Sequence, residues 1–176
     1  MASSLRRNHF IFCLSVHLFL LTFMLSTIVR SCQQKRNMQS VKAHAIRLKP
    51  GQDLKKEIQQ LVNEQHIKAG WISTCAGSLT DYNIRFANQP NGSTGTGHFE
   101  IVSLTGTVST NGSHIHISIS DSTGQTLGGH LLDGNIIYTT AEIVVLSSGD
   151  FEFTREKDGS TPWEELQVKQ KRNANE

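Results

Sequence analysis

The sequence predicts an α+β domain in which one amphipathic helix packs on a largely antiparallel sheet of seven to eight strands. Three observations lead to this prediction. One segment alone carries apolar residues at helical spacing, many short segments alternate apolar and polar residues, and turn-forming residues separate these segments. The 176 residues are enough for one domain of ordinary size, and the chain contains no internal repeat.

The first predicted elements are a strand and the helix. Residues 41–48 alternate apolar positions and stop at Pro50-Gly51, which breaks a strand. Asp53 is suited to cap a helix that ends near His66, because its side chain can accept hydrogen bonds from the first free N–H groups. The apolar stripe of this helix consists of Leu54, Ile58, Leu61 and Val62.

Strands make up the rest of the predicted domain. Residues 88–97 contain no apolar side chain and predict a loop. Asn111-Gly112 is the preferred pair for a tight hairpin turn and joins two long strands. The expected strands cover residues 71–78, 82–86, 99–110, 113–120, 125–132, 135–146 and 151–154.

The chain divides into three parts. Residues 1–37 contain an apolar run over 10–29 with basic residues on both sides. This pattern fits a cleaved signal peptide, a membrane anchor, or an upstream extension of a chain whose working start is Met38. Residues 38–156 form the domain, and residues 157–176 are expected to be a charged flexible tail. The protein is secretory or membrane-anchored if residues 1–37 are translated and used, and cytoplasmic otherwise.

The charge of the domain argues against a direct role in binding DNA. Five of the 17 basic residues, and none of the 15 acidic ones, lie before Met38, so the remainder carries a net charge of about −3. A surface that follows a phosphate backbone needs clustered Lys and Arg. The positive charge of the chain therefore belongs to its N-terminal extension.

Three histidines are the strongest chemical signal. His114 and His116 lie on one face of a strand, while Ile115, Ile117 and Ile119 take the other face. If the strand that contains His130 lies alongside, three imidazoles converge. Three neutral histidines with an open fourth position are typical of a catalytic zinc site, so zinc is the cofactor that these residues fit. The alternatives are a subunit interface and a solvated polar face.

Other candidates surround this cluster. Glu100 and Glu142 are the acids nearest in sequence that could serve as a base or orient a ligand, although no catalytic residue is assigned. Arg85 either contacts an anion or forms an ion pair with an acid such as Glu100. Gly128-Gly129 predicts close backbone approach, with a β-bulge favoured over a phosphate cradle. No hydrolase elbow, Walker-type loop or dinucleotide fingerprint occurs in the sequence.

Taken in order and spacing, residues 41–153 resemble the PPC (plants and prokaryotes conserved) domain family. The matching stretches are Ala69-Gly70-Trp71-Ile72-Ser73, Gly77-Ser78-Leu79, Ile84-Arg85-Phe86-Ala87, Gly97-His98-Phe99-Glu100-Ile101-Val102-Ser103-Leu104-Thr105-Gly106, His114-Ile115-His116-Ile117-Ser118-Ile119-Ser120-Asp121, Gly128-Gly129-His130-Leu131 and Thr139-Thr140-Ala141-Glu142.

This resemblance implies a helix packed on about seven strands and assembly as a homotrimer. Plant members carry an Arg-Phe-Glu motif for contacts with partner proteins. His98, Phe99 and Glu100 stand at the corresponding positions here, with His in place of Arg. The family's minor-groove DNA binding resides in an AT-hook, and no Arg-Gly-Arg-Pro hook occurs in this chain.

Three functions remain open from the sequence. The first is a trimeric binding or scaffolding module with a histidine-lined cleft, to which Arg85, Gly128 and Gly129 would contribute. The second is a zinc-dependent, hydrolase-like enzyme that uses His114 and His116 with His130. The third is a transcription-associated module that acts through protein partners. A fold alone does not choose among them.

Overall fold

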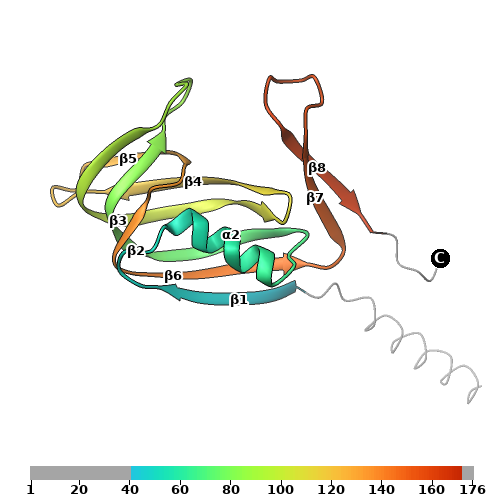
Figure 1. The fold of residues 1–176 in the computed structure, drawn as a ribbon, viewed down its shortest axis with the longest axis horizontal. Helices are drawn as coiled ribbons and strands as arrows, with labels where there is room; N and C mark the ends of the chain where they lie inside the picture. The colour runs from blue at the N-terminus through green and yellow to red at the C-terminus, as the bar shows by residue number, and fades with distance from the viewer. Residues whose placement is uncertain (1–40, 172–176) are drawn as a thin grey trace, which may run out of the picture. The chain divides into compact units, whose positions relative to one another are not determined.

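The computed structural model describes residues 41–171. The signal peptide, membrane anchor or upstream extension predicted for residues 1–37 lies outside the described residues. In chain order the elements are β1 (Val41–Leu48), α2 (Leu54–Glu64), β2 (Gly70–Arg85), β3 (Ser93–Ser109), β4 (Gly112–Ser120), β5 (Thr126–Leu131), β6 (Ile136–Ser148), β7 (Phe151–Glu156) and β8 (Glu165–Gln170) (Figure 1). None of the helices in this range has the length and apolar character needed to cross a bilayer.

Six strands form the main sheet in the order β1-β6-β2-β3-β4-β5, and β5 also pairs with the end of β2. Every one of these pairings is antiparallel. The remaining two strands, β7 and β8, form a separate antiparallel hairpin. The α+β class with one helix on a mostly antiparallel sheet is thus confirmed, with the eight described strands split between a six-stranded sheet and a two-stranded hairpin.

The helix α2 lies across one face of the sheet (Figure 1). Its N-cap is Asp53, whose carboxylate accepts hydrogen bonds from the backbone N–H groups of Lys55 and Lys56 at 3.1 and 3.3 Å. The predicted apolar stripe is confirmed, because Leu54, Ile58 and Val62 are fully buried. These side chains meet the buried faces of the strands, and together they form one hydrophobic core.

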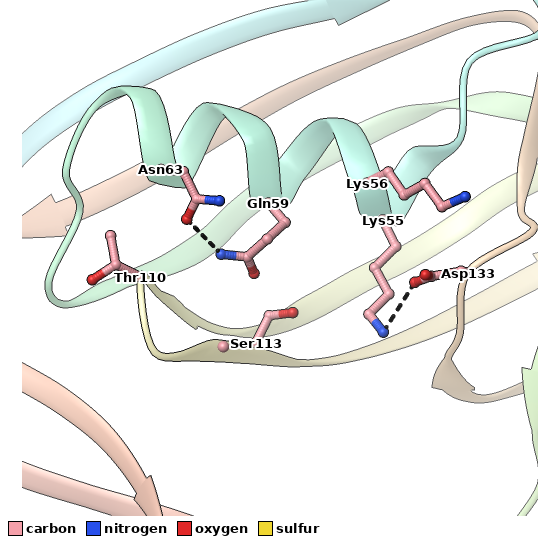
Figure 2. A pocket seen from close by; sticks show the side chains of 8 residues that line it. Lys55, Lys56, Gln59, Asn63, Thr110, Ser113 and Asp133 are labelled. Carbon is pink, nitrogen blue, oxygen red and sulfur yellow. Dashed lines mark hydrogen bonds and ion pairs between the residues drawn. The ribbon is translucent and has the colours of Figure 1, made fainter.

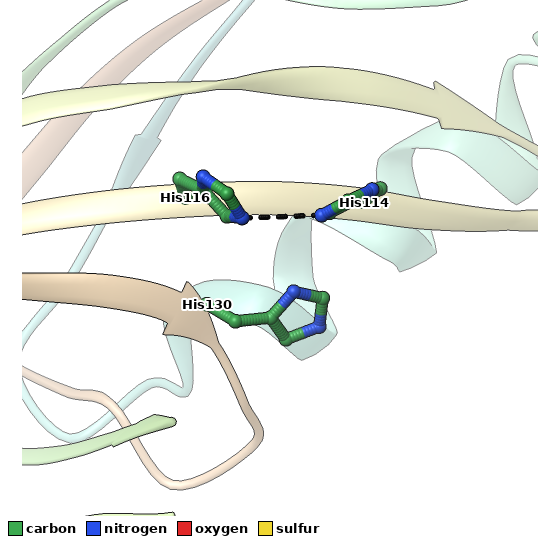
Figure 3. A group of neighbouring side chains, drawn as sticks. All are labelled: His114, His116 and His130. Carbon is green, nitrogen blue, oxygen red and sulfur yellow. Dashed lines mark hydrogen bonds between the residues drawn. The ribbon is translucent and has the colours of Figure 1, made fainter. Parts of the chain in front are cut away.

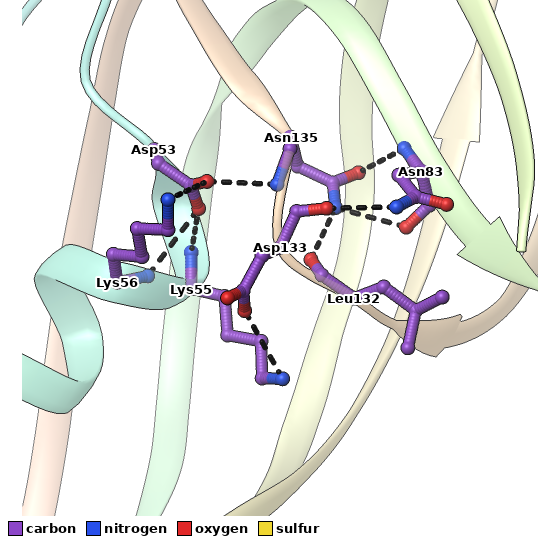
Figure 4. Close-up of polar contacts among 8 residues, drawn as sticks. Asp53, Lys55, Lys56, Asn83, Leu132, Asp133 and Asn135 are labelled. Atoms are coloured by element: carbon purple, nitrogen blue, oxygen red, sulfur yellow. Dashed lines mark hydrogen bonds and ion pairs between the residues drawn. The ribbon is translucent and has the colours of Figure 1, made fainter.

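A polar network ties the start of α2 to the loop between β5 and β6 (Figure 4). Asn135 is fully buried, and its amide donates to the carbonyl oxygens of Leu132 and Asn83 at 2.7 and 3.0 Å. The Asp53 carboxylate also accepts from the backbone N–H of Gly134 at 2.7 Å. Because a buried polar group is costly when it has no partner, these bonds hold the loop after β5 in one conformation.

Hydrogen bonds of Phe153 in β7 attach the hairpin β7–β8 to the main sheet. The backbone N–H of Phe153 donates to the carbonyl of Lys68 at 2.9 Å. The Phe153 carbonyl accepts from the hydroxyl of Ser109 at 3.1 Å and from the amide of Asn111 at 3.2 Å. These contacts place β7 beside the β3–β4 turn.

Several predicted boundaries were wrong. The predicted strands over 71–78 and 82–86 form one strand, β2, which ends at Arg85, and a register shift against β3 between Leu79 and Asp81 is all that separates them in that pairing. The predicted loop over 88–97 is shorter, since β3 begins at Ser93 and pairs with β2 despite its polar composition. Part of the predicted flexible tail over 157–176 is the strand β8, which pairs with β7 along its whole length.

Candidate metal centre

The register of β4 and β5 brings the three histidines together (Figure 3). His116 lies directly opposite His130 across the two strands, and His114 is two residues along β4 on the same face. Ile115 and Ile117 point to the opposite face and are buried in the core. The alternation of β4 therefore presents imidazoles on its outer face because apolar side chains fix its inner face.

One ring nitrogen from each of His114, His116 and His130 lies within 4.8 Å of the other two. The Nε2 atoms of His114 and His116 are 3.1 Å apart. Nitrogens bound to one tetrahedral zinc at about 2.0–2.1 Å are about 3.3 Å apart. Small rotations of the exposed His114 and His116 rings would thus bring all three nitrogens within reach of one ion.

The electrostatics of the cluster favour the neutral forms of His114 and His130. Burial lowers the pKa of His130 to about 4, with the positive charges of His114 and Arg85 acting in the same direction. The pKa of His114 is lowered as well, first by burial and then by the charge of His116. A neutral imidazole has a free lone pair, which is the form that binds metals.

An unsatisfied atom also marks the site. The Nδ1 of His130 is buried and has no hydrogen-bond partner among residues 41–171. Buried polar atoms without a protein partner are rare, and those that do occur often contact an ion or an ordered water molecule. The donor set and this orphaned nitrogen both fit a divalent metal of the zinc class.

A pocket of about 600 Å³ opens beside the histidines. Two of its lining residues, Arg155 and Trp163, come from the C-terminal hairpin and its loop. Neither Arg155 nor Trp163 was predicted at the site from the sequence, because the segment around Trp163 has the composition of a flexible tail. A second pocket, of about 530 Å³, lies beside α2, where Lys55 pairs with Asp133 at 3.2 Å (Figure 2).

Arg85 lies at this site, whereas the two candidate acids do not. Arg85 is the residue opposite His130 across β2 and β5, and it forms no ion pair with Glu100. Glu100 is exposed and lies five residues along β3 from the residue opposite His116, about 16 Å at the usual rise per residue. Glu142 is exposed on β6 and lies opposite Ala76 of β2. Neither acid lines the pocket beside the histidines.

The remaining candidate residues make packing contacts within the fold. The ring of His98 stacks on that of Tyr138 with centroids 4.2 Å apart, and Phe99 meets the edge of Tyr82 at 5.1 Å. Gly128 and Gly129 allow the expected close approach, since an added Cβ would lie 2.7 Å from the Ile117 oxygen or 2.5 Å from the Arg85 oxygen, respectively. The predicted β-bulge at these glycines is wrong, because the register of β4 and β5 runs without a shift from His116 to Ser120.

The sequence matches the Plants and Prokaryotes Conserved (PCC) domain over residues 35–149, which is most of the chain. The chain belongs to this family. A hypothetical protein from Salmonella cholerae-suis (Salmonella enterica) has the same fold, with a TM-score of 0.73 and 35% identity over 76% of this chain and 97% of that one. A metal-containing protein from Archaeoglobus fulgidus gives a TM-score of 0.63 and 26% identity over 73% of this chain and 96% of that one.

Among curated sequences, the chain is similar to the bifunctional protein GlmU of Synechococcus sp. strain JA-2-3B'a(2-13). The identity is 40% over 129 residues, which is 73% of this chain and 20% of that protein. The chain thus spans about a fifth of the length of the curated relatives that it matches. The likeness covers too little of the relative to extend to the activities of that whole protein.

Proposed function

We propose that this protein is a metal-binding PPC domain in which His114, His116 and His130 hold one divalent ion, with zinc the best fit. The observation that carries the proposal is the convergence of three ring nitrogens within 4.8 Å of one another on two adjacent strands. The lowered pKa values of His114 and His130 support it, as does the metal-containing relative from Archaeoglobus fulgidus.

A metal held by three histidines keeps a coordination position for water or a ligand, where it can act as a Lewis acid. The protein would hold the ion through His114, His116 and His130, and two of these residues, His114 and His130, line the pocket. This arrangement favours a domain that binds a small molecule at the metal. Glu100 and Glu142, the acids predicted as a possible general base, lie away from the histidines, so a hydrolytic step has less support than binding.

The test is metal analysis of the full chain, purified without chelators and without a histidine tag. We expect about one zinc-class ion per chain, and its loss in the His116→Ala and His130→Ala variants. His98→Ala is the matched control, because His98 stacks on Tyr138 and is outside the cluster. Wild-type protein that takes up no metal when titrated with zinc, or a His116→Ala variant that retains it, would contradict the proposal.

We also infer that the protein assembles as a homotrimer, as the family resemblance implies. The face of the sheet away from α2 supports self-association, because it has apolar side chains that no helix in the described part of the chain covers. Leu146 of β6 lies between Ala43 of β1 and Trp71 of β2 on this face. Val102 and Tyr138 are 60% and 41% exposed. Light scattering coupled to size exclusion should give the mass of three chains.

A further inference from the structure

We propose that the C-terminal hairpin β7–β8 completes a pocket over the three histidines, and that this pocket binds a small organic oxyanion, a carboxylate or a phosphate, between Arg85 and Arg155. The inference deepens the proposed metal site and rests on it, since the anion would lie next to the bound ion. The matched family domain ends at residue 149, so the whole hairpin lies beyond it.

The pocket has two walls from different parts of the chain. Arg85, His114 and His130 belong to the main sheet, whereas Arg155, Trp163 and Glu165 belong to the hairpin or its loop. Its volume of about 600 Å³ is in the range of small-molecule sites. The hydrogen bonds of Phe153 to Lys68, Ser109 and Asn111 fix the hairpin wall against the sheet.

The two arginines lie on either side of the histidine cluster. Arg85 is directly opposite His130 in the pairing of β2 with β5. Thr107 is directly opposite His114 in the pairing of β3 with β4, and Arg155 donates to the Thr107 hydroxyl at 2.8 Å. Residues opposite each other in antiparallel strands project from the same face, so both guanidinium groups border the face that carries the imidazoles.

Both guanidinium groups keep hydrogen-bond donors available. Arg85 donates to the carbonyl of Gln89 at 3.4 Å and has its guanidinium carbon 5.6 Å from the centre of the Trp163 ring. Arg155 has its one bond to Thr107. Neither arginine has a carboxylate within 4.0 Å in residues 41–171. A guanidinium has five N–H donors in a fixed fork, so each retains the geometry that suits a carboxylate or phosphate.

The charge of the lining also favours an anion. Lys157 adds a third cation, against the two acids Glu164 and Glu165. Burial lowers the pKa of Arg155, which shows that its charge has lost part of its hydration. The charge of Glu165 acts on the pKa of Arg155 in the opposite direction, but no carboxylate lies within 4.0 Å of it in residues 41–171. A partly desolvated cation with no carboxylate in direct contact is stabilised when an anion binds. A bound divalent metal would increase this preference.

The test measures binding of two probes, inorganic phosphate and succinate, to the zinc-loaded full chain by calorimetry. Losing one charged hydrogen-bonding group costs about tenfold or more in affinity. We therefore expect the Arg85→Gln and Arg155→Gln substitutions each to lower the affinity for the tighter-binding probe by about tenfold or more. Arg155→Lys should give a partial loss, because it keeps the charge without the fork. Arg47→Gln, at an exposed position of β1, is the matched control.

The two probes distinguish a phosphate ligand from a carboxylate ligand, and zinc content is measured on the same samples. Equal affinities of wild type, Arg85→Gln and Arg155→Gln in zinc-loaded protein would overturn the pocket while leaving the metal site intact. Failure of wild type to hold zinc would overturn the metal site, and arginine-dependent binding of a probe to that protein would still support the anion pocket. Thermal melting confirms that each variant is folded.

Discussion

His44 is a buried histidine on β1 whose charge state depends on the fold. It is 8% exposed, and its Nε2 lies 2.9 Å from the Ser147 hydroxyl. Its pKa in the folded protein is lowered from 6.5, first by burial and then by the charge of Lys42. Above pH 6.5 the imidazole is neutral in both states. Below that pH the unfolded chain binds a proton that the folded chain resists, so stability falls as the pH falls.

The His44→Gln variant tests this at the residue scale. Glutamine is neutral at every pH and can still bond to Ser147. Stability measured by urea unfolding should therefore decrease less for the variant than for wild type between pH 6.5 and 5, by up to about 1.4 kcal/mol per pH unit. All other residues are the same in both proteins, so their contributions cancel in the difference. If the stability of the two proteins changes with pH in the same way, His44 does not contribute to the pH dependence.

The shared face of the histidine pair on β4 could be predicted from the sequence, but the surroundings of the pair could not. Alternation along one strand depends only on neighbouring residues, so the shared face of His114 and His116 follows from the sequence alone. Arg155 reaches the site because it bonds to Thr107, 48 positions earlier in the chain. No local pattern encodes that contact, since it depends on where the hairpin docks.

The pairing of β5 with β2 is a contact between elements that places His130. The backbone at Gly129 lies so close to β2 that an added Cβ would be 2.5 Å from the Arg85 carbonyl oxygen. A backbone oxygen cannot rotate away, so the two strands would have to separate. Because β5 also pairs with β4, any such shift changes the position of His130, the next residue, relative to His116.

Gly129→Ala should therefore destabilise the protein and weaken its metal site together. Overpacking of this kind costs about 1–3 kcal/mol in the free energy of unfolding. We expect a weaker zinc titration in the same variant, because the three nitrogens no longer converge. Gly149→Ala is the control, since no atom lies within 4 Å of its added Cβ. If the Gly129→Ala protein has the same free energy of unfolding and the same zinc affinity as wild type, β5 tolerates the added methyl group.

Helices and strands that depend on local sequence could be predicted, whereas strands that depend on a distant pairing partner could not. The helix over Leu54–Glu64 and its Asp53 cap followed from the sequence, because capping and an apolar stripe are local features. β8 did not, because its charged segment is a strand only when paired with β7. The first residues of β3 contain no apolar side chain, and they become a strand by pairing with β2.

At the scale of the whole molecule, α2 covers one face of the sheet, and no helix among residues 41–171 covers the other (Figure 1). On the open face Val144 of β6 lies between Ala45 of β1 and Thr74 of β2. Small and apolar side chains on a sheet surface allow another sheet to approach closely. Exposed apolar area of this kind is typical of an interface with another protein. In the inferred homotrimer this face is the surface we expect to be shared between copies.

Ala45→Glu should dissociate the trimer without unfolding the chain. Ala45 is exposed in the single chain, so a glutamate there can stay hydrated, whereas burial at an interface would leave its charge without a partner. Asn63→Glu makes the same change of charge on the exposed side of α2 and should leave the mass unchanged. If Ala45→Glu keeps the mass of three chains, the copies meet through another surface. If its metal content also stays at the wild-type level while the mass falls to one chain, each subunit holds its ion alone, as the placement of all three histidines within one chain leads us to expect.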